Sequence, residues 1–215
     1  MIAIVDYGMG NLRSVSKAFQ NQGFDVNVTK DPDAIKSASG LVLPGQGAFG
    51  DCVRNLEENG IFGTIRDYIT SGKPYLGICL GLQVLFEGSD ESPGVPGLGL
   101  LRGRVVRFPS FKKERLKVPH MGWNRIEIKK ETAVLDGVPD GSWFYFVHSY
   151  YPVPEDDGVV AITCSYGVQF TAAIAEGNMF ACQFHPEKSS TYGLRLLSNF
   201  GLLCGESPRG RKLSS

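Results

Sequence analysis

Apolar runs and helical segments alternate through the first half of the chain. The runs predict short buried strands, and the segments between them carry apolar residues at helical spacing. The predicted strands are Ile2–Val5, Asp25–Val28, Leu41–Leu43 and Tyr75–Ile78. The predicted helices are Asn11–Gln22, a segment from Phe49 to Leu56, Ile61–Thr70 and Leu80–Phe86. This alternation is typical of an open parallel sheet with helices on both faces.

The second half is rich in strands separated by turns. The predicted strands are Val105–Phe108, Trp123–Ile128, Trp143–Val147, Val159–Cys164, Phe170–Ala175 and Met179–Phe184, and a helix over Thr191–Leu203 follows them. We therefore predict one α/β domain over residues 1–204, an open, mostly parallel twisted sheet with flanking helices and an antiparallel β extension. The polar, glycine-rich residues 205–215 predict a flexible tail.

Composition narrows the function classes. Lys+Arg and Asp+Glu both number 22, so the chain carries no bulk sign of a nucleic-acid binder. No apolar run approaches the roughly 20 residues that cross a bilayer, and the N-terminus does not resemble a signal peptide. The 5 cysteines form no disulfide framework, which favours a reducing cytoplasm. We expect a cytoplasmic protein with no nucleic-acid or membrane partner, no metal and no organic cofactor.

The most informative segment is "PYLGICLGLQ", Pro74–Gln83. An apolar strand ends in a G-x-C-x-G turn around Cys79 and a helix follows, which is the pattern of a nucleophile elbow. The turn lifts the sulfur out at the carboxyl end of the sheet, and the helix N-terminus favours a thiolate. The N–H of Leu80 is placed to donate to an oxyanion. The alternative is that Cys79 is a small buried hydrophobe, the reading we adopt for Cys52, Cys164 and Cys204.

A base and its orienting carboxylate are found in "CQFHPEKSS", Cys182–Ser190. His185 can take the thiol proton, and Glu187 can hold the other ring nitrogen. His120 and His148 have no acidic residue nearby in sequence, so we interpret them as surface or satisfied core residues. Cys182 and His185 have a zinc-like spacing, but no second Cys/His pair completes four ligands.

Several stretches together resemble one known family. G-x-C-x-G after a strand and H-P-E about a hundred residues later resemble the class I (triad) glutamine amidotransferases. The closest resemblance is to the glutaminase subunits of imidazole glycerol phosphate synthases, and it runs from residue 4 to about residue 200. It is carried by "IVDYGMGNLRSV", "LVLPGQGAFGDC", "GICLGLQVLFEGSDE", "GLGLLRGRVVRF", "VPHMGWN", "FYFVHSYY" and "QFHPEKS".

The resemblance implies a flavodoxin-like fold and a catalytic triad of Cys79, His185 and Glu187. It implies that L-glutamine is hydrolysed to glutamate and ammonia, which passes to a (β/α)8-barrel cyclase subunit in a heterodimer of histidine biosynthesis. It also implies a set of substrate-binding residues, which are Gly45, Gln46 and Gly47 of an oxyanion strand, Leu80, Gln83, Glu91, Ser149 and Tyr150. Without the resemblance, "PGQGAFG" is an ordinary turn and Gln83 a solvated helix residue.

The partner's docking face should be exposed and aromatic. "YGMGN", Trp123 and Tyr145 are candidates, although strand aromatics more often pack in a core. Three other functions stay open. A related amidotransferase could serve another pathway, although the "PGQG" stretch differs from the "GGES" typical of the vitamin B6 glutaminases. The chain could be a binding module without catalysis. It could also be a hydrolase or cysteine protease, but the order Cys, His, Glu differs from that of α/β-hydrolases.

Overall fold

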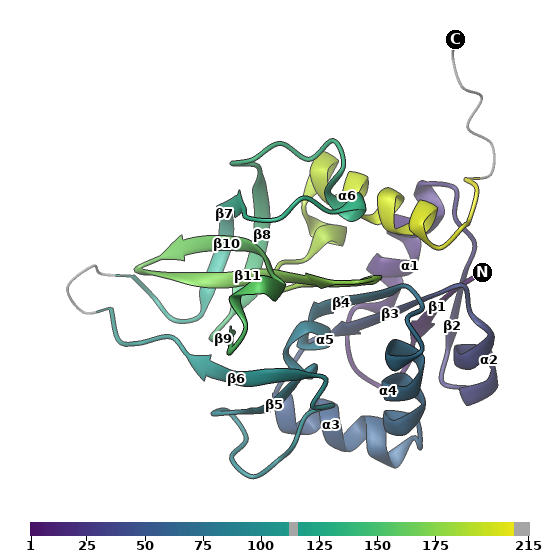
Figure 1. Cartoon of the computed structure of the whole chain (residues 1–215), viewed down its shortest axis with the longest axis horizontal. Coiled ribbons are helices and arrows are strands. Elements are labelled where there is room, and N and C mark those ends of the chain that lie inside the picture. The colour runs from purple at the N-terminus through teal and green to yellow at the C-terminus, as the bar shows by residue number, and fades with distance from the viewer. Residues whose placement is uncertain (112–115, 209–215) are drawn as a thin grey trace.

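A twisted sheet runs through the computed structural model, which describes residues 1–111 and 116–208 (Figure 1). Within these residues the sheet has 9 strands in the order β2-β1-β3-β4-β12-β11-β10-β7-β8. The first five in that order are parallel: β2 (Val26–Thr29), β1 (Ile2–Val5), β3 (Gly40–Gly45), β4 (Tyr75–Cys79) and β12 (Met179–Cys182). The rest form the antiparallel extension: β11 (Val168–Glu176), β10 (Val160–Tyr166), β7 (His120–Ile128) and β8 (Trp143–His148).

Helices cover both faces of the parallel part (Figure 1). One face carries α1 (Leu12–Asn21) and α6 (Ser190–Leu203), which contact each other. The other carries α2 (Pro32–Ser37), α3 (Phe49–Glu58), α4 (Phe62–Thr70) and the short α5 (Leu80–Gln83). A second sheet, of β5 (Phe86–Ser89), β6 (Leu101–Arg107) and β9 (Tyr150–Pro154), lies beside α3 and α5. The predicted fold class is confirmed.

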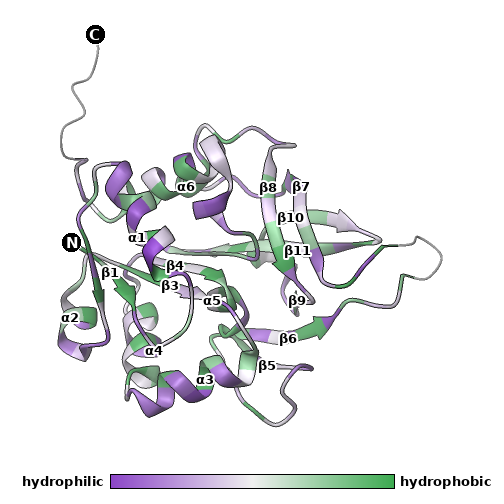
Figure 2. Ribbon diagram, turned by 180° about the vertical axis from the view of Figure 1, so that it is seen from behind, coloured by the Kyte–Doolittle hydropathy of each residue, from purple (hydrophilic) through white to green (hydrophobic). Residues whose placement is uncertain are grey.

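The buried residues of the sheet divide between two apolar cores. In β1, Ile2 and Ile4 pack in the core under α1 and α6, whereas Ala3 and Val5 pack in the core under α2 to α5. Successive side chains of a strand point to opposite faces, so a strand buried on both faces is apolar at every position. Figure 2 shows this as hydrophobic colour concentrated on the inner strands.

The predicted helix Leu80–Phe86 is wrong beyond Gln83. The carbonyls of Val84 and Leu85 accept hydrogen bonds from Leu98 and from Leu100 and Leu101, so they cannot continue a helical ladder. Phe86 then begins β5. The prediction failed because apolar spacing over a few residues does not separate a helix from a turn that enters a buried strand. Besides β5, two further elements were not predicted. These are α2, which begins at Pro32 after the N-cap Asp31, and β9, whose prolines weaken its strand signal.

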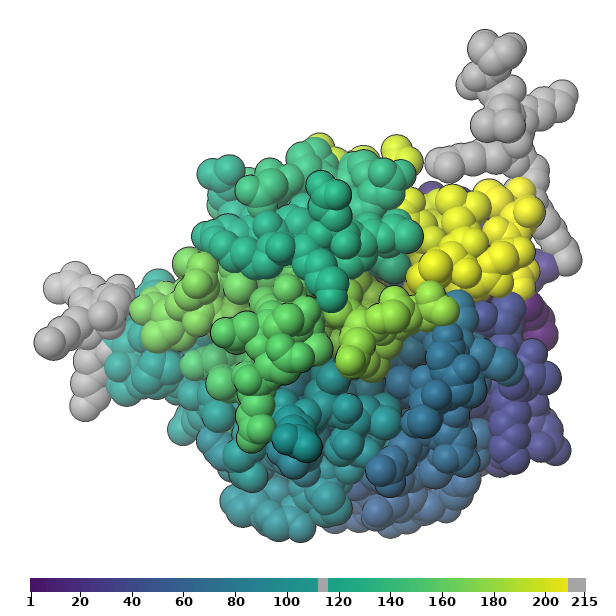
Figure 3. Space-filling model, viewed as in Figure 1, coloured from purple at the N-terminus to yellow at the C-terminus, as the bar shows by residue number. Residues whose placement is uncertain are grey.

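The two ends of the described chain lie side by side (Figures 1 and 3). The carboxylate of Glu206 accepts hydrogen bonds from the N-terminal amine and, at 2.6 Å, from the hydroxyl of Ser39. The predicted flexible tail begins at Gly205, and residues 209–215 of it lie outside the described residues. None of the helices in the described part of the chain is long and apolar enough to cross a membrane.

Candidate active site

Cys79 sits on a strained turn between β4 and α5. Its φ is +56° and its ψ is −102°, a conformation that residues other than glycine seldom adopt. Two glycines make the turn possible. A Cβ at Gly77 would lie 2.4 Å from the carbonyl oxygen of Gly81, and a Cβ at Gly81 would lie 2.0 Å from that of Leu43. The strand–turn–helix geometry expected of a nucleophile elbow is therefore present around Cys79.

The order of the strands gathers the candidate groups at one edge of the sheet. β3, β4 and β12 are parallel neighbours, so their carboxyl ends meet. Gly45 at the end of β3 pairs with Cys79 at the end of β4. On the other side of β4, Cys182 pairs with Ile78, and the chain reaches His185 three residues later. A cysteine, a histidine and a glycine-rich segment are thus brought together from three separate parts of the sequence.

His185 and Glu187 form a buried pair. Nδ1 of His185 lies 2.9 Å from Oε1 of Glu187, and the two side chains are 2% and 1% exposed. This contact leaves Nε2 of His185 free to exchange a proton with Cys79, and in the described part of the chain Nε2 has no hydrogen-bond partner. Burial acts to lower the pKa of His185, but the nearby Cys79 and Glu187 outweigh it and raise that pKa to about 9.

The segment after β3 is held against the elbow. The hydroxyl of Tyr7 donates to the carbonyl of Pro44 at 2.9 Å, in a buried position. Gly45 packs so closely that a Cβ there would lie 2.4 Å from Cβ of Leu80. Gly47 has a φ of +105°, which a glycine adopts readily. These constraints fix the backbone N–H groups that follow Pro44 close to Cys79.

A pocket of about 430 Å³ opens above Cys79. This is a size typical of small-molecule sites. The predicted site residues that line it are Gln46, Gly47, Cys79, Leu80, Gln83, Glu91, Ser149, Tyr150 and His185. Two predicted residues do not line it: Gly45 lies beside the elbow, and Glu187 lies behind His185. Glu91 also accepts a hydrogen bond of 2.7 Å from the N–H of Phe49, which ties it to the start of α3.

Gln83 is buried and part of a hydrogen-bonded network. Its Nε2 donates to the carbonyl of Tyr150 at 3.1 Å and to Oε1 of Gln183 at 3.0 Å. Nε2 of Gln183 in turn donates to Sγ of Cys79 at 3.5 Å. Gln83 is therefore not a solvated helix residue. Sequence reasoning missed Gln183, although its place two residues before His185 was a usable signal.

Other lining residues were also missed. Lys188 lines the pocket, and its Nζ lies 5.9 Å from the centre of the Tyr145 ring. His148 lines the pocket too, and it forms a buried hydrogen-bonded pair with His120. The reading of both histidines as satisfied core residues holds for His120, whereas His148 also reaches the site. Nothing in their sequence neighbourhood indicated the pairing, because it joins residues 28 positions apart.

Exposed aromatic and apolar side chains lie next to the pocket on β7 and β8. Met121 is 63% exposed and Trp123 is 49% exposed. The rings of Trp123 and Tyr145 meet edge to face with their centres 6.3 Å apart. Core packing, which was the alternative for Trp123, is therefore wrong, because β7 lies near the edge of the sheet and turns this residue outward.

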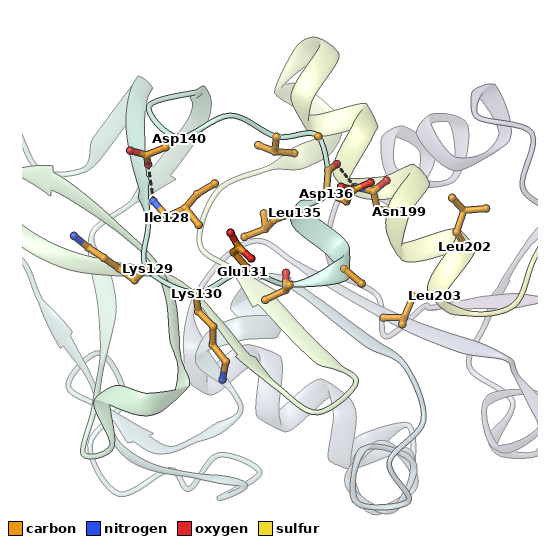
Figure 4. Close-up of a pocket in the computed structure, with 14 residues that line it drawn as sticks. Ile128, Lys129, Lys130, Glu131, Leu135, Asp136, Asp140, Asn199, Leu202 and Leu203 are labelled. Carbon is orange, nitrogen blue, oxygen red and sulfur yellow. Dashed lines mark hydrogen bonds between the residues drawn. The ribbon is translucent and has the colours of Figure 1, made fainter.

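A larger hollow of about 1160 Å³ lies elsewhere, between α6 and the segment that follows β7 (Figure 4). It is lined by charged residues such as Lys129, Glu131 and Asp140 and by the apolar Leu202 and Leu203. It holds no cysteine or histidine, so the pocket above Cys79 is the better candidate for chemistry. No group of three or more His, Cys, Asp or Glu side chains within residues 1–111 and 116–208 is arranged to hold a metal ion.

Comparison with known proteins identifies similar chains. The family model "Glutamine amidotransferase class-I" matches residues 3–204. The imidazole glycerol phosphate synthase subunit HisH of Geobacter sulfurreducens is 52% identical over 203 residues, which cover 93% of this chain and 97% of that protein. The HisH of Methanothermobacter thermautotrophicus is 54% identical over 200 residues, covering 93% and 97%.

Solved structures share the fold at lower identity. A structure titled as a glutamine amidotransferase has a TM-score of 0.71 and 23% identity, and it covers 95% of this chain and 100% of its own. PurLQS from Thermotoga maritima also has a TM-score of 0.71, at 20% identity, and it covers 93% of this chain and 96% of its own. These likenesses concern the fold.

Proposed function

The chain belongs to the class-I glutamine amidotransferase family, and we propose that within it the chain is the glutaminase subunit of an imidazole glycerol phosphate synthase. In this role it hydrolyses L-glutamine to glutamate and ammonia for histidine biosynthesis. The observation that carries the assignment is identity above 50% with proteins of that name over more than 90% of this chain. The site supports it, because the elbow cysteine and the buried His–Glu pair meet in one pocket.

The first half of the proposed reaction forms a covalent intermediate. Cys79, as the thiolate, attacks the side-chain carboxamide carbon of glutamine, and His185 holds the proton on Nε2. The carboxamide oxygen becomes an oxyanion, which the N–H of Leu80 and one N–H of Gly45, Gln46 or Gly47 stabilise. His185 then protonates the amide nitrogen, the C–N bond breaks, and ammonia leaves a glutamyl thioester on Cys79.

The second half restores the enzyme. His185, now neutral at Nε2, takes a proton from a water molecule, which attacks the thioester carbon. The C–S bond breaks, glutamate is released and the Cys79 thiolate with its imidazolium partner re-forms. Glu187 keeps Nδ1 of His185 protonated throughout, so that Nε2 is the nitrogen that exchanges protons. Splitting one amide cleavage into two steps lowers the barrier of each.

The pocket also offers groups for the amino-acid end of glutamine. Glu91 is the acidic residue among those lining the pocket, and we assign its carboxylate to the substrate ammonium. The Ser149–Tyr150 backbone and Gln83 also line the pocket, and we assign them to the rest of the amino-acid end. The substrate carboxamide then reaches Cys79, which lines the same pocket.

The proposed partner is a (β/α)8-barrel cyclase subunit in a heterodimer. Ammonia released into water is protonated and loses its nucleophilicity, so direct transfer between sites preserves it. The exposed Met121 and Trp123, with Tyr145 beside them, provide an apolar-aromatic docking face at the mouth of the pocket. We also propose a cytoplasmic location, in keeping with cysteines that are all unpaired in the described residues.

The partner assignment is tested by a transfer experiment. The full chain is mixed with the cyclase subunit of imidazole glycerol phosphate synthase, its ribonucleotide substrate and either glutamine or ammonium salt. We expect glutamine to support product formation only when the chain is present, while ammonium supports it with the cyclase alone. A chain that releases glutamate but never supplies the cyclase would belong to another synthase.

A further inference from the structure

A continuous network of hydrogen bonds leads from β7 to the carbonyl of Tyr150, a residue that lines the pocket. Nδ2 of Asn124 lies 3.2 Å from Nε2 of His120, and Nδ1 of His120 lies 3.0 Å from Nε2 of His148. Nδ1 of His148 then lies 2.8 Å from the carbonyl oxygen of Tyr150. His120 and His148 are 2% and 5% exposed, so most of this hydrogen-bonded network is shielded from solvent.

The carbonyl at one end fixes the tautomer of both rings. A carbonyl oxygen only accepts, so Nδ1 of His148 must carry the proton, which leaves Nε2 of a neutral ring as an acceptor. That acceptor requires Nδ1 of His120 to be the donor, so Nε2 of His120 accepts from the amide N–H of Asn124. Each ring donates once and accepts once, so every hydrogen bond in the network is donated in the same direction, from Asn124 towards Tyr150.

The surroundings keep both rings neutral. His120 stacks against Tyr166 and Phe146, with ring centres 4.1 Å and 4.9 Å apart. The ring of Phe170 lies 5.1 Å from that of His148. Burial in this aromatic shell lowers the pKa of His120 to about 4 and that of His148 to about 3. A proton added to Nε2 of His148 would face the Nδ1–H of His120, so this set of donors and acceptors requires both rings to be neutral.

The Tyr150 carbonyl is a junction between this network and the network at Cys79. It accepts from His148 on one side and from Nε2 of Gln83 on the other. Gln83 continues through Gln183 to the sulfur of Cys79. The orientation of this peptide therefore fixes both the Ser149–Tyr150 wall and the Gln83 side chain.

We propose that the His120–His148 pair is a positioning element for glutamine, which holds the Tyr150 carbonyl and thereby the wall that binds the amino-acid end of the substrate. The inference rests on the proposed function, since it concerns the same pocket. The hydrogen bonds of the two rings go to each other, to Asn124 and to the Tyr150 carbonyl, and not to Cys79 or His185. They act through Tyr150 and Gln83.

The test compares two reagents on the full chain. An electrophilic glutamine analogue alkylates Cys79 only after its amino-acid end binds, whereas iodoacetamide needs only a reactive thiol. The second-order rate constant of the analogue divided by that of iodoacetamide isolates the contribution of the pocket wall that binds the amino-acid end. Saturation of labelling with the analogue gives its binding constant separately from the reactivity of Cys79, and circular dichroism with a thermal melt checks that each variant is folded.

Two variants of one residue separate positioning from packing. His148→Asn keeps an N–H close to the position of Nδ1, within reach of the Tyr150 carbonyl, whereas His148→Gln moves the amide to the position of Nε2. We expect the ratio to fall at least tenfold in His148→Gln and to stay within threefold of wild type in His148→Asn. In His120→Phe, which preserves the ring but removes the donor, we expect a fall of at least fivefold. Tyr166 stacks against His120 but takes no part in the hydrogen-bonded network, so Tyr166→Phe should leave the ratio unchanged.

The outcomes separate this inference from the proposed function. Equal ratios in His148→Asn and His148→Gln, or a wild-type ratio in folded His120→Phe, would overturn the positioning role and leave the glutaminase intact. A fall in the iodoacetamide rate that matches the fall in the analogue rate would also overturn it, because that would place the effect on Cys79. A wild-type chain that the glutamine analogue fails to label saturably would instead overturn both proposals.

Discussion

Nδ1 of His185 lies 2.9 Å from Oε1 of Glu187, and neither side chain is more than 2% exposed. A buried carboxylate in this position orients the ring and stabilises its protonated form. Glu187→Gln keeps the shape and loses the charge. We expect kcat for glutamate release to fall on the order of 10²- to 10⁴-fold, which is less than the loss in Cys79→Ala, because orienting groups are partly dispensable. An unchanged kcat would show that Glu187 does not orient the base.

The glycine after the nucleophile should tolerate no side chain. In Gly81→Ala the new Cβ would lie 2.0 Å from the carbonyl oxygen of Leu43, so the elbow must shift. We expect a loss of stability of about 1–3 kcal/mol or more, measured by denaturant unfolding. Gly63→Ala is the matched control, because this helical glycine has open space around its Cα and should gain up to about 1 kcal/mol. Equal stabilities in the two variants would contradict the packing described for the elbow.

Tyr7 should matter for both stability and catalysis. Its hydroxyl donates to the carbonyl of Pro44, which precedes the proposed oxyanion segment. Tyr7→Phe leaves a buried carbonyl without its partner, at a cost of about 1–3 kcal/mol. We also expect a lower kcat with little change in iodoacetamide labelling of Cys79, since the thiol itself is untouched. A kcat equal to wild type would mean that Tyr7 anchors the fold and not the oxyanion segment.

The histidine pair should make the fold sensitive to acid. The pKa values of His120 and His148, about 4 and about 3, lie below the ordinary value of 6.5, so the unfolded state binds more protons between these limits. Their contribution to stability is complete above pH 6.5 and is lost as pH falls toward 4 and 3. Each histidine contributes a slope of up to about 1.4 kcal/mol per pH unit.

Urea unfolding of wild type and of the His120→Phe, His148→Phe double variant measures this effect. The difference between the two pH profiles removes the contribution of carboxylates that titrate in the same range. We expect the slope between pH 6.5 and 4 to be shallower in the variant. Parallel profiles would show that the pair is not buried in its neutral form.

The elements that could be predicted from the sequence are those whose structure is determined by residues close together in the chain. The inner strands β1, β3, β4 and β12 were predicted because they contain continuous apolar runs, and the elbow was predicted because Gly77 and Gly81 flank a cysteine after such a strand. The distance between Cys79 and His185 in sequence is no obstacle, since strand order alone brings the ends of β4 and β12 together.

What sequence reasoning missed depends on contacts between distant segments. The helix predicted to reach Phe86 ends at Gln83, because Leu98 and Leu101 take the backbone carbonyls that would have continued it. His120 and His148 pair across β7 and β8, which their separate sequence neighbourhoods do not indicate. For Trp123 the sequence left an exposed docking face and core packing open, and the structure decides between them because the side chain is 49% exposed.

Cys79 is central as the proposed nucleophile that serves a partner. The direct measurement is glutamate release from glutamine by the full chain, alone and with the cyclase subunit and its ribonucleotide ligand, with Cys79→Ala beside wild type. The account predicts release that the partner and ligand stimulate and that Cys79→Ala abolishes. Wild-type rates of release in Cys79→Ala, or no release from the wild-type chain in any mixture, would contradict it.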